Sequence, residues 1–184
     1  SILRPRGYRT PTKTRILAGG VHSAKQQVVR IDRSAVPQID DADRRAVAAR
    51  LKKAASRSDA LLVSDYGSGV VSPQLVSDAQ KSLGRRGRHR GPMLVDSRYS
   101  LLSYRGMTTC TPNESEVEQI LDIRIDDDVE VLERAGRLLL QRTGMQAVLI
   151  TRGSRGMALF ERRQRTIHLP IFGSDEVADV TGAG

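Results

Sequence analysis

Short apolar runs alternate with amphipathic segments along most of the chain, and this alternation constrains the fold more than any other feature. Four runs have the length and apolar character of buried strands: residues 60–67 (ALLVSDYG), 92–96 (PMLVD), 107–112 (MTTCTP) and 145–153 (MQAVLITRG). Four other segments have apolar residues at helical spacing: 41–57, 72–84, 114–121 and 126–144. Strands that alternate with helices form βαβ units, so the sequence predicts an α/β fold with a doubly wound, mostly parallel sheet and helices on both faces.

End signals support several of these elements. Segment 41–57 begins with aspartates and ends with basic residues, the order that the helix dipole favours. In the next helix we expect Ser72 as N-cap, Pro73 at the first helical position and Gly84 as the stop. Extended strands are predicted at 12–20 and 26–32, and a hairpin at 156–170 with the polar residues 162–164 at its tip.

The composition indicates a globular protein and argues against a nucleic-acid-binding module. The chain is 39% hydrophobic and 28% charged, and no apolar run approaches the roughly 20 residues that span a bilayer. Its single cysteine, Cys110, has no internal disulfide partner, which is typical of the cytoplasm. The net charge of +9 would suit a polyanion, yet the 25 Arg and 5 Lys are spread along the chain. Their densest cluster, residues 84–91 (GRRGRHRG), has no aromatic side chain for base stacking, so we interpret it as a solvated loop, with phosphate contact as an alternative.

Ligand sites of parallel sheets lie beyond the carboxyl ends of the strands, where this sequence places polar loops. Asn113 and Glu116 stand three residues apart at a predicted helix start, a place that favours phosphate. Glu116 could hold a hydrated Mg²⁺ that binds phosphate, and an ordinary helix cap is the alternative. Thr151 and Gly153 follow another strand in TRGSRG, where a plain β-turn is the alternative.

Two further stretches have the same character. Asp65 and Tyr66 follow a strand, where they would either contact substrate or phosphate or form a simple turn. Residues 179–184 (DVTGAG) offer consecutive backbone N–H groups with little side-chain obstruction. If a helix begins there, these groups form an anion hole for a transferring phosphoryl group; otherwise the stretch is a flexible end. We interpret Cys110 as a core residue, and residues 126–128 as a helix N-terminus and not as a metal cluster.

Together these loops resemble the signature motifs of the PfkB, or ribokinase-like, carbohydrate kinases. DVTGAG is similar to the family's D-x-T-G-A-G-D, Asn113 and Glu116 match N-x-x-E, and Thr151 and Gly153 match T-x-G, in the family's order. Residues 12–32, 61–69 and 94–118 also resemble the heptose-phosphate kinase branch. That branch usually has Lys where this chain has Ser68, and Pro-Lys at 97–98, where this chain has Ser and Arg.

The resemblance implies ATP-dependent phosphoryl transfer to a sugar hydroxyl, with heptose 7-phosphate as the acceptor, in the supply of ADP-heptose for lipopolysaccharide. A different sugar or nucleoside acceptor and an inactive relic are the alternatives. ATP, Mg²⁺ and a monovalent cation such as K⁺ are the implied cofactors; specific nucleic acid and membrane partners are not expected. The implied site residues are Gly182, Ala183 and Gly184 (anion hole), Asn113, Glu116, Thr151, Gly153 and Arg98 (nucleotide), Glu116 (Mg²⁺ through water), Asp179 and Thr181 (monovalent cation), and Asp65 and Tyr66 (substrate or phosphate).

The family's catalytic base is an Asp directly after G-A-G, and the sequence ends at Gly184. We therefore expect residues 1–184 to be one partial kinase domain, truncated at both ends and nearly inactive alone. Lid or edge strands are expected at about 12–32 and a nucleotide-binding α/β core at 40–184. Relatives use such a lid as a dimer contact, which implies a homodimer for the complete protein.

Overall fold

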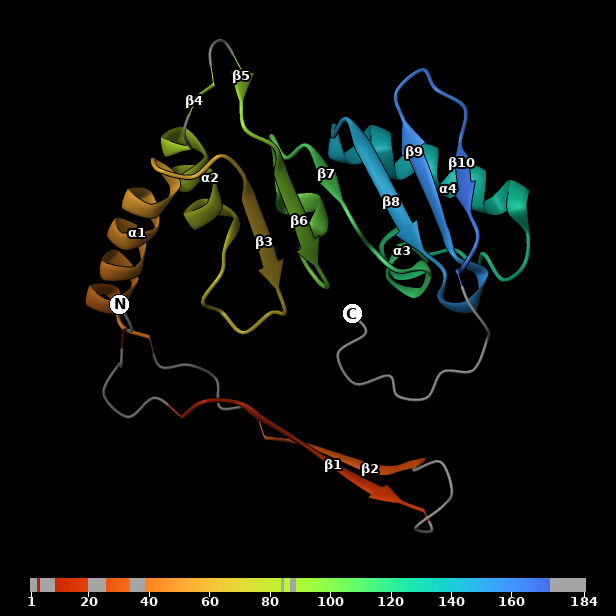
Figure 1. The fold of residues 1–184 in the computed structure, drawn as a ribbon, viewed down its shortest axis with the longest axis horizontal. Coiled ribbons are helices and arrows are strands. Elements are labelled where there is room, and N and C mark those ends of the chain that lie inside the picture. The colour runs from red at the N-terminus through yellow and green to blue at the C-terminus, as the bar shows by residue number, and fades with distance from the viewer. Residues whose placement is uncertain are drawn as a thin grey trace. The chain divides into compact units, whose positions relative to one another are not determined.

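The structure is a computed structural model that describes residues 3, 9–19, 26–33, 39–83, 85–86 and 89–172 (Figure 1). The chain forms two compact units. One runs from Asp40 to Ile171, and the other comprises Ser1–Ile39 with Phe172–Gly184. Within the described residues, no helix is both long and apolar enough to cross a membrane.

The larger unit is built on a six-stranded sheet with the order β10-β9-β8-β7-β6-β3. Four neighbouring strands pair in parallel: β3 (Leu61–Asp65), β6 (Met93–Ser97), β7 (Thr109–Cys110) and β8 (Ala147–Thr151). At one edge, β9 (Met157–Glu161) pairs antiparallel with β8, and β10 (Ile167–Leu169) pairs antiparallel with β9. The predicted mostly parallel α/β fold and the predicted hairpin are confirmed.

The predicted helices form as α1 (Asp41–Ala55), α2 (Pro73–Ser82), α3 (Glu114–Leu121) and α4 (Val129–Thr143). The Ser72 hydroxyl caps α2 by accepting a hydrogen bond of 3.2 Å from the Leu75 N–H, and Pro73 opens the helix as predicted. Helix α2 ends at Ser82, and the expected stop, Gly84, lies outside the described residues. Short 3-10 turns follow β6 and β8, namely η1 (Leu101–Ser103) and η2 (Gly153–Arg155).

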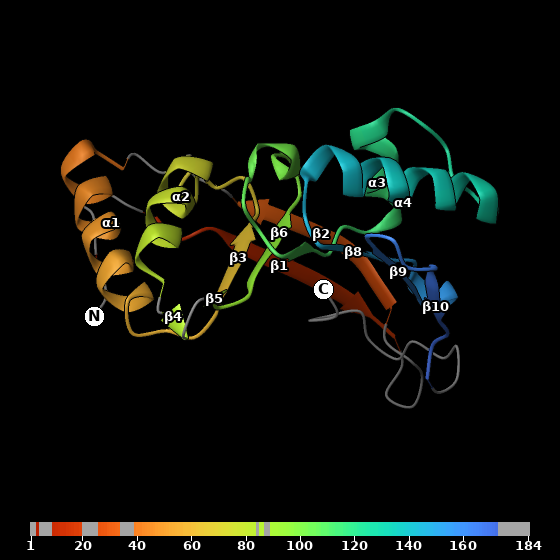
Figure 2. The ribbon, with the colours of Figure 1, turned by 90° about the horizontal axis from the view of Figure 1, so that it is seen from above.

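Helices α2, α3 and α4 pack against one face of the sheet, and α1 packs against α2. Val63, Val95 and Phe160 point from the sheet into one core that includes Val117 of α3 and Leu139 of α4. The next residue on the other face, Leu62, is 73% exposed. The reason is topological. Strands β3, β6, β7 and β8 follow one another in one direction across the sheet, so right-handed crossovers place their connections on the same side. Figure 2 shows α3 and α4 together on one side of β8, β9 and β10.

Close packing holds α4 against this face. Gly136 of α4 lies against the Phe160 ring, where an added Cβ would be 2.4 Å from Cζ of Phe160. Cys110 of β7 is fully buried in the same core, as expected, and burial raises the pKa of its thiol to about 12. The thiol therefore acts as a small apolar group.

The smaller unit contains an antiparallel pair of strands, β1 (Thr12–Ala18) and β2 (Gln26–Arg33), at the two predicted positions. Its two faces differ in chemistry. Ile16 lies opposite Val29 on one face, whereas Arg15 lies opposite Arg30 on the other. Every residue of both strands is exposed.

The basic cluster at 84–91 was expected to be a loop and differs in the structure. Its backbone forms two short antiparallel strands, β4 (Arg85–Arg86) and β5 (His89–Arg90), which pair with each other. Two-residue strands carry too little periodicity to be recognised from sequence.

Candidate functional site

The N-x-x-E and T-x-G motifs meet at the carboxyl edge of the sheet, where β7 and β8 end. Asn113 and Thr151 form a parallel bridge that continues the pairing of these strands. The Thr151 N–H donates a hydrogen bond of 3.0 Å to the carbonyl of Pro112. Two loops predicted separately to be functional are therefore neighbours, joined by their own backbones.

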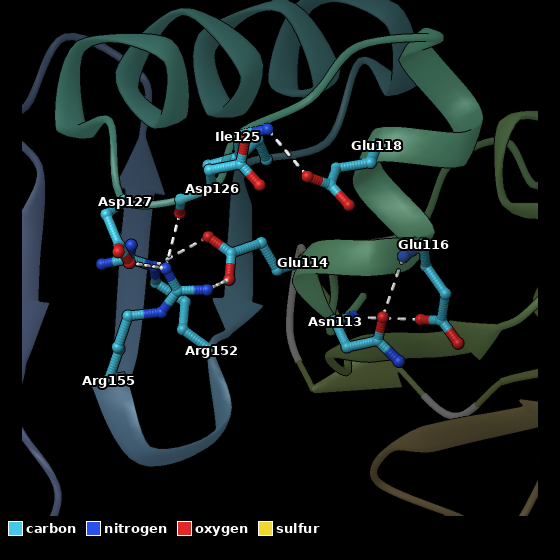
Figure 3. Close-up of polar contacts among 9 residues, drawn as sticks. All are labelled: Asn113, Glu114, Glu116, Glu118, Ile125, Asp126, Asp127, Arg152 and Arg155. Carbon is cyan, nitrogen blue, oxygen red and sulfur yellow. Dashed lines mark hydrogen bonds and ion pairs between the residues drawn. The ribbon is translucent and has the colours of Figure 1, made fainter.

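Asn113 and Glu116 form a reciprocal cap on α3 (Figure 3). The Asn113 side chain accepts a hydrogen bond of 2.8 Å from the Glu116 N–H, and Oε2 of Glu116 accepts one of 3.0 Å from the Asn113 N–H. Asn113 is exposed, and Glu116 is partly buried. Oε1 of Glu116 accepts no hydrogen bond from any part of the chain that the structure describes. The cap and the metal role are thus compatible, because one carboxylate oxygen holds the helix end and the other faces outward.

Glu114, in the same turn of α3, is buried and contacts arginine side chains. Glu114 is 8% exposed, and its Oε1 accepts a hydrogen bond of 3.2 Å from Nε of Arg152. Its Oε2 is paired with the guanidinium of Arg155. Arg155 also reaches the Asp127 carboxylate and the carbonyl of Asp126, in the connection between α3 and α4. Figure 3 shows Glu114 extending toward both arginines while Glu116 turns back on Asn113.

This cluster was not predicted from the sequence. The T-x-G motif of the TRGSRG loop includes Thr151 and Gly153 but neither of the two arginines, Arg152 and Arg155. The available signal was a pair of glutamates, Glu114 and Glu116, in one helical turn opposite an arginine-rich loop. That signal does not tell which carboxylate faces inward, because the answer depends on how α3 is rotated against β8.

The loop after β8 uses glycine where the backbone requires it. Gly153 has φ +58° and Gly156 has φ +79°, in the left-handed region that favours glycine. An added Cβ on Gly156 would lie 2.0 Å from the carbonyl oxygen of Leu169. The Arg152 N–H donates a hydrogen bond of 2.8 Å to the Gly156 carbonyl and closes the loop. Gly153 is exposed at the tip of this turn, a position that permits close approach of a ligand.

Asp65 lies inside the domain and not at its surface. The carboxylate, 6% exposed, accepts hydrogen bonds from the Tyr104 hydroxyl at 2.7 Å, the Ser97 hydroxyl at 3.1 Å and the Gly67 N–H at 3.0 Å. Burial first, and then the hydrogen bond and charge of Asp65, raises the pKa of Tyr104 above its usual value. With this carboxylate occupied by the fold, the geometry does not favour its predicted contact with substrate. Its neighbour Tyr66 is 64% exposed at the same edge, and a ligand contact there stays a prediction.

Arg98, also predicted to bind nucleotide, follows β6 at this edge. Its backbone N–H donates to the Asp65 carbonyl at 3.2 Å, and its guanidinium lies 5.6 Å from the centre of the Tyr99 ring. Together with Gln119 and Ile120 of α3, both residues line a surface pocket of about 280 Å³. Among the described residues, the Arg98 side chain forms no hydrogen bond or ion pair with Asn113 or Thr151.

The remaining predicted site residues, Asp179, Thr181, Gly182, Ala183 and Gly184, lie outside the described residues. Within residues 39–83 and 89–172, no group of three or more His, Cys, Asp or Glu could hold a metal ion by itself. A metal at this edge would therefore depend on Glu116 together with ligand phosphate oxygens and water, the arrangement that Mg²⁺ commonly adopts with nucleotides.

The family profile described as pfkB family carbohydrate kinase matches residues 8–184. The chain belongs to this family. The motif resemblance noted above is thereby confirmed, and the bridge between Asn113 and Thr151 joins two of the family's motifs.

Two curated relatives, each called bifunctional protein HldE, illustrate the similarity. The relative from Geobacter sulfurreducens is 40% identical over 176 residues, which cover 95% of this chain and 34% of the relative. The relative from Pelobacter propionicus is 41% identical over 178 residues, covering 96% of this chain and 34% of the relative. The chain thus spans about a third of the length of the curated relatives that it matches.

Solved structures show the same fold at low sequence identity. Phosphofructokinase-2 from Escherichia coli, in complex with substrates and products, has a TM-score of 0.58 at 16% identity, covering 84% of this chain and 49% of that one. Arabidopsis thaliana ribokinase, complexed with ribose and ATP, has a TM-score of 0.55 at 19% identity, covering 84% and 48%. These likenesses confirm the ribokinase-like fold.

Proposed function

We propose that this chain is the nucleotide-binding part of an ATP-dependent kinase that phosphorylates a hydroxyl group of a sugar phosphate. The observation that carries the proposal is the bridge between Asn113 and Thr151, which brings two motifs of a carbohydrate kinase family to one edge of the sheet. Phosphoryl transfer depends on positioning and on stabilisation of charge, so a fixed relation between phosphate-binding loops is the feature such a reaction needs.

The described residues would have separate roles in binding ATP and Mg²⁺. The N-terminus of α3 would favour the phosphates of ATP, and Glu116 would hold Mg²⁺ through its outward oxygen, directly or through water. The exposed turn at Gly153 would lie along the nucleotide. Mg²⁺, when bound, neutralises the charge that develops on the transferred phosphoryl group. The roles of Gly182, Ala183 and Gly184 as an anion hole, and of Asp179 and Thr181 at a monovalent cation, remain part of the proposal.

We further propose D-glycero-D-manno-heptose 7-phosphate as the acceptor and ADP-heptose supply for lipopolysaccharide as the role. Support comes from the heptose-branch motifs at 12–32, 61–69 and 94–118 and from the identity of about 40% to relatives named HldE. A pfkB-family kinase of another sugar is the alternative, and it differs in the acceptor alone.

The test is ADP release by the full-length protein against heptose 7-phosphate, ribose, fructose and fructose 6-phosphate, each with Mg²⁺ and with K⁺ or Na⁺. We expect the highest kcat/KM with the heptose phosphate. A preference for another sugar would keep the kinase and replace the acceptor. Residues 1–184 do not include the position of the family's base after G-A-G, so we propose that this stretch alone phosphorylates sugar much more slowly than the full-length protein.

We also propose that the β1–β2 hairpin mediates a homodimer. Two-stranded hairpins are marginally stable alone in water, and this one exposes Ile16 and Val29 together on one face, at 47% and 44%. A second copy could cover that face. An Ile16→Lys variant is expected to shift the sedimentation of the full-length protein toward monomer, whereas Arg15→Glu on the opposite, charged face is the matched control. Unchanged sedimentation of both variants would contradict the dimer contact.

A further inference from the structure

We infer that Glu114 is a positioning residue that sets the spacing between the two nucleotide-binding loops, through its ion pairs with Arg152 and Arg155. The inference rests on the proposed function and extends it to a residue outside the family motifs. Glu114 stands between Asn113 and Glu116 in sequence, yet it points away from both and into the loop after β8 (Figure 3).

The geometry makes Glu114 the link between the loops. The carboxylate uses its two oxygens for two different arginines, Oε1 for Arg152 and Oε2 for Arg155. Both arginines belong to the loop that contains Gly153, whereas Glu114 is the first residue of α3 and follows Asn113 directly. A shift of α3 along its axis would therefore be transmitted to the loop that carries Gly153.

Burial makes this link strong and its loss consequential. The side chains of Glu114 and Arg152 are 11% and 9% exposed, so water competes poorly for either charge. Removal of one member of such a pair leaves the other charge buried without its partner. Arg155 extends the link to Asp127 and to the carbonyl of Asp126, so the connection from α3 to α4 is held by the same guanidinium.

This arrangement predicts that loss of the Glu114 charge weakens the binding of ATP but not that of the acceptor sugar. The backbone bridge between Asn113 and Thr151 fixes one point of contact between the loops, but Gly153 lies beyond it in a turn whose glycines give the backbone freedom. The ion pairs restrict that turn from its other side. Without the Glu114 charge, the turn at Gly153 would sample other positions and would bind ATP less well, while the acceptor sugar would be unaffected.

The test is steady-state kinetics of Glu114→Gln in the full-length protein, with the KM for ATP and the KM for the acceptor sugar measured separately. Glutamine keeps the side-chain length and one acceptor oxygen and removes the charge. We expect the KM for ATP to rise about tenfold, in the range seen when supporting groups around a bound ion are removed. The KM for the sugar should stay within about twofold of the unchanged enzyme.

The matched control is Glu130→Gln. Glu130 lies in the first turn of α4 and pairs with Arg134, but both of those side chains are exposed. Arg155→Gln provides a second variant in case Glu114→Gln folds poorly, because the Arg155 side chain is 39% exposed and its loss leaves the Glu114–Arg152 pair in place. It should raise the KM for ATP in the same direction, by a smaller factor.

Two outcomes would overturn the inference. One is a KM for ATP in Glu114→Gln equal to that of Glu130→Gln. The other is a parallel loss for ATP and sugar that follows the folded fraction, which would mean that the ion pairs serve stability alone. Failure of the proposed function has a different signature: the unchanged protein would neither bind ATP in a calorimetric titration nor phosphorylate any sugar of the panel.

Discussion

The Tyr104 hydroxyl donates a hydrogen bond of 2.7 Å to Oδ2 of Asp65, although 39 residues separate the two in sequence. The pair ties the loop around η1 to the carboxyl end of β3. Because both residues are buried, the carboxylate depends on this donor, on Ser97 and on Gly67 in place of water. The Ser97 and Tyr104 hydroxyl groups therefore hold the Asp65 carboxylate at the carboxyl end of β3.

Tyr104→Phe is expected to lower the free energy of unfolding by about 1–3 kcal/mol, because it leaves a buried carboxylate with one donor fewer and changes little else in shape. Urea denaturation at pH 7 measures the effect. Tyr99→Phe is the control, since Tyr99 is 64% exposed. Equal stability of the two variants would show that Asp65 does not need this donor.

Gly136→Ala separates two opposing effects at one position. Helix propensity alone predicts that alanine stabilises α4 by about 1 kcal/mol. The added Cβ, however, would lie 2.4 Å from the Phe160 ring, and such overpacking costs about 1–3 kcal/mol. We therefore expect Gly136→Ala to lower the free energy of unfolding in a thermal or urea melt. The same substitution should cost less when it is made in a Phe160→Leu protein and compared with Phe160→Leu alone. A more stable Gly136→Ala protein would contradict the close packing of α4 on β9.

The buried Cys110 predicts both chemical protection and a pH dependence. Burial raises its pKa to about 12, above the roughly 8.5 of a free thiol. The unfolded state therefore loses the thiol proton first. This contribution to stability is complete below about pH 8.5 and declines toward pH 12, by up to about 1.4 kcal/mol per pH unit.

A thiol reagent such as Ellman's reagent should not react with the native protein at pH 8 and should react fully in urea. Unfolding free energies at pH 8, 9 and 10 should decline less steeply in Cys110→Ala than in the unchanged protein. Rapid labelling of the native protein would place the thiol at the surface and contradict its burial.

The fold could be predicted from the sequence to the extent that each element carries its own local signal. Ser72 and Pro73 indicate the start of α2, and the apolar run from Ala147 to Thr151 predicts a strand. The one-sided placement of the helices could not be read in this way, because it depends on the order of the strands across the sheet, which no local pattern encodes. The short pairing of Arg85–Arg86 with His89–Arg90 is too brief to leave a periodic signal.

In the candidate site as well, residues in local sequence motifs could be predicted, whereas contacts set by tertiary packing could not. Asn113, Glu116, Thr151 and Gly153 could be proposed as site residues because they belong to motifs with fixed spacing. Glu114 was missed because its partners lie about 40 residues away, in a loop whose contact with α3 is set by tertiary packing. Asp65 was predicted either to contact substrate or phosphate or to form a simple turn, and its surroundings could not be predicted because Tyr104 and Ser97, which donate hydrogen bonds to its buried carboxylate, lie more than 30 residues away.

Binding of Mg–ATP at the first turn of α3 is tested most directly by Glu116→Gln, with ADP release measured against Mg²⁺ concentration in the full-length protein. Glutamine retains the reciprocal cap with Asn113, so stability should change by less than about 0.5 kcal/mol. It removes the charge that would hold the metal, so we expect the Mg²⁺ concentration for half-maximal rate to rise roughly 10- to 100-fold. An unchanged Mg²⁺ dependence would contradict this placement of the metal and reduce Asn113 and Glu116 to a helix cap.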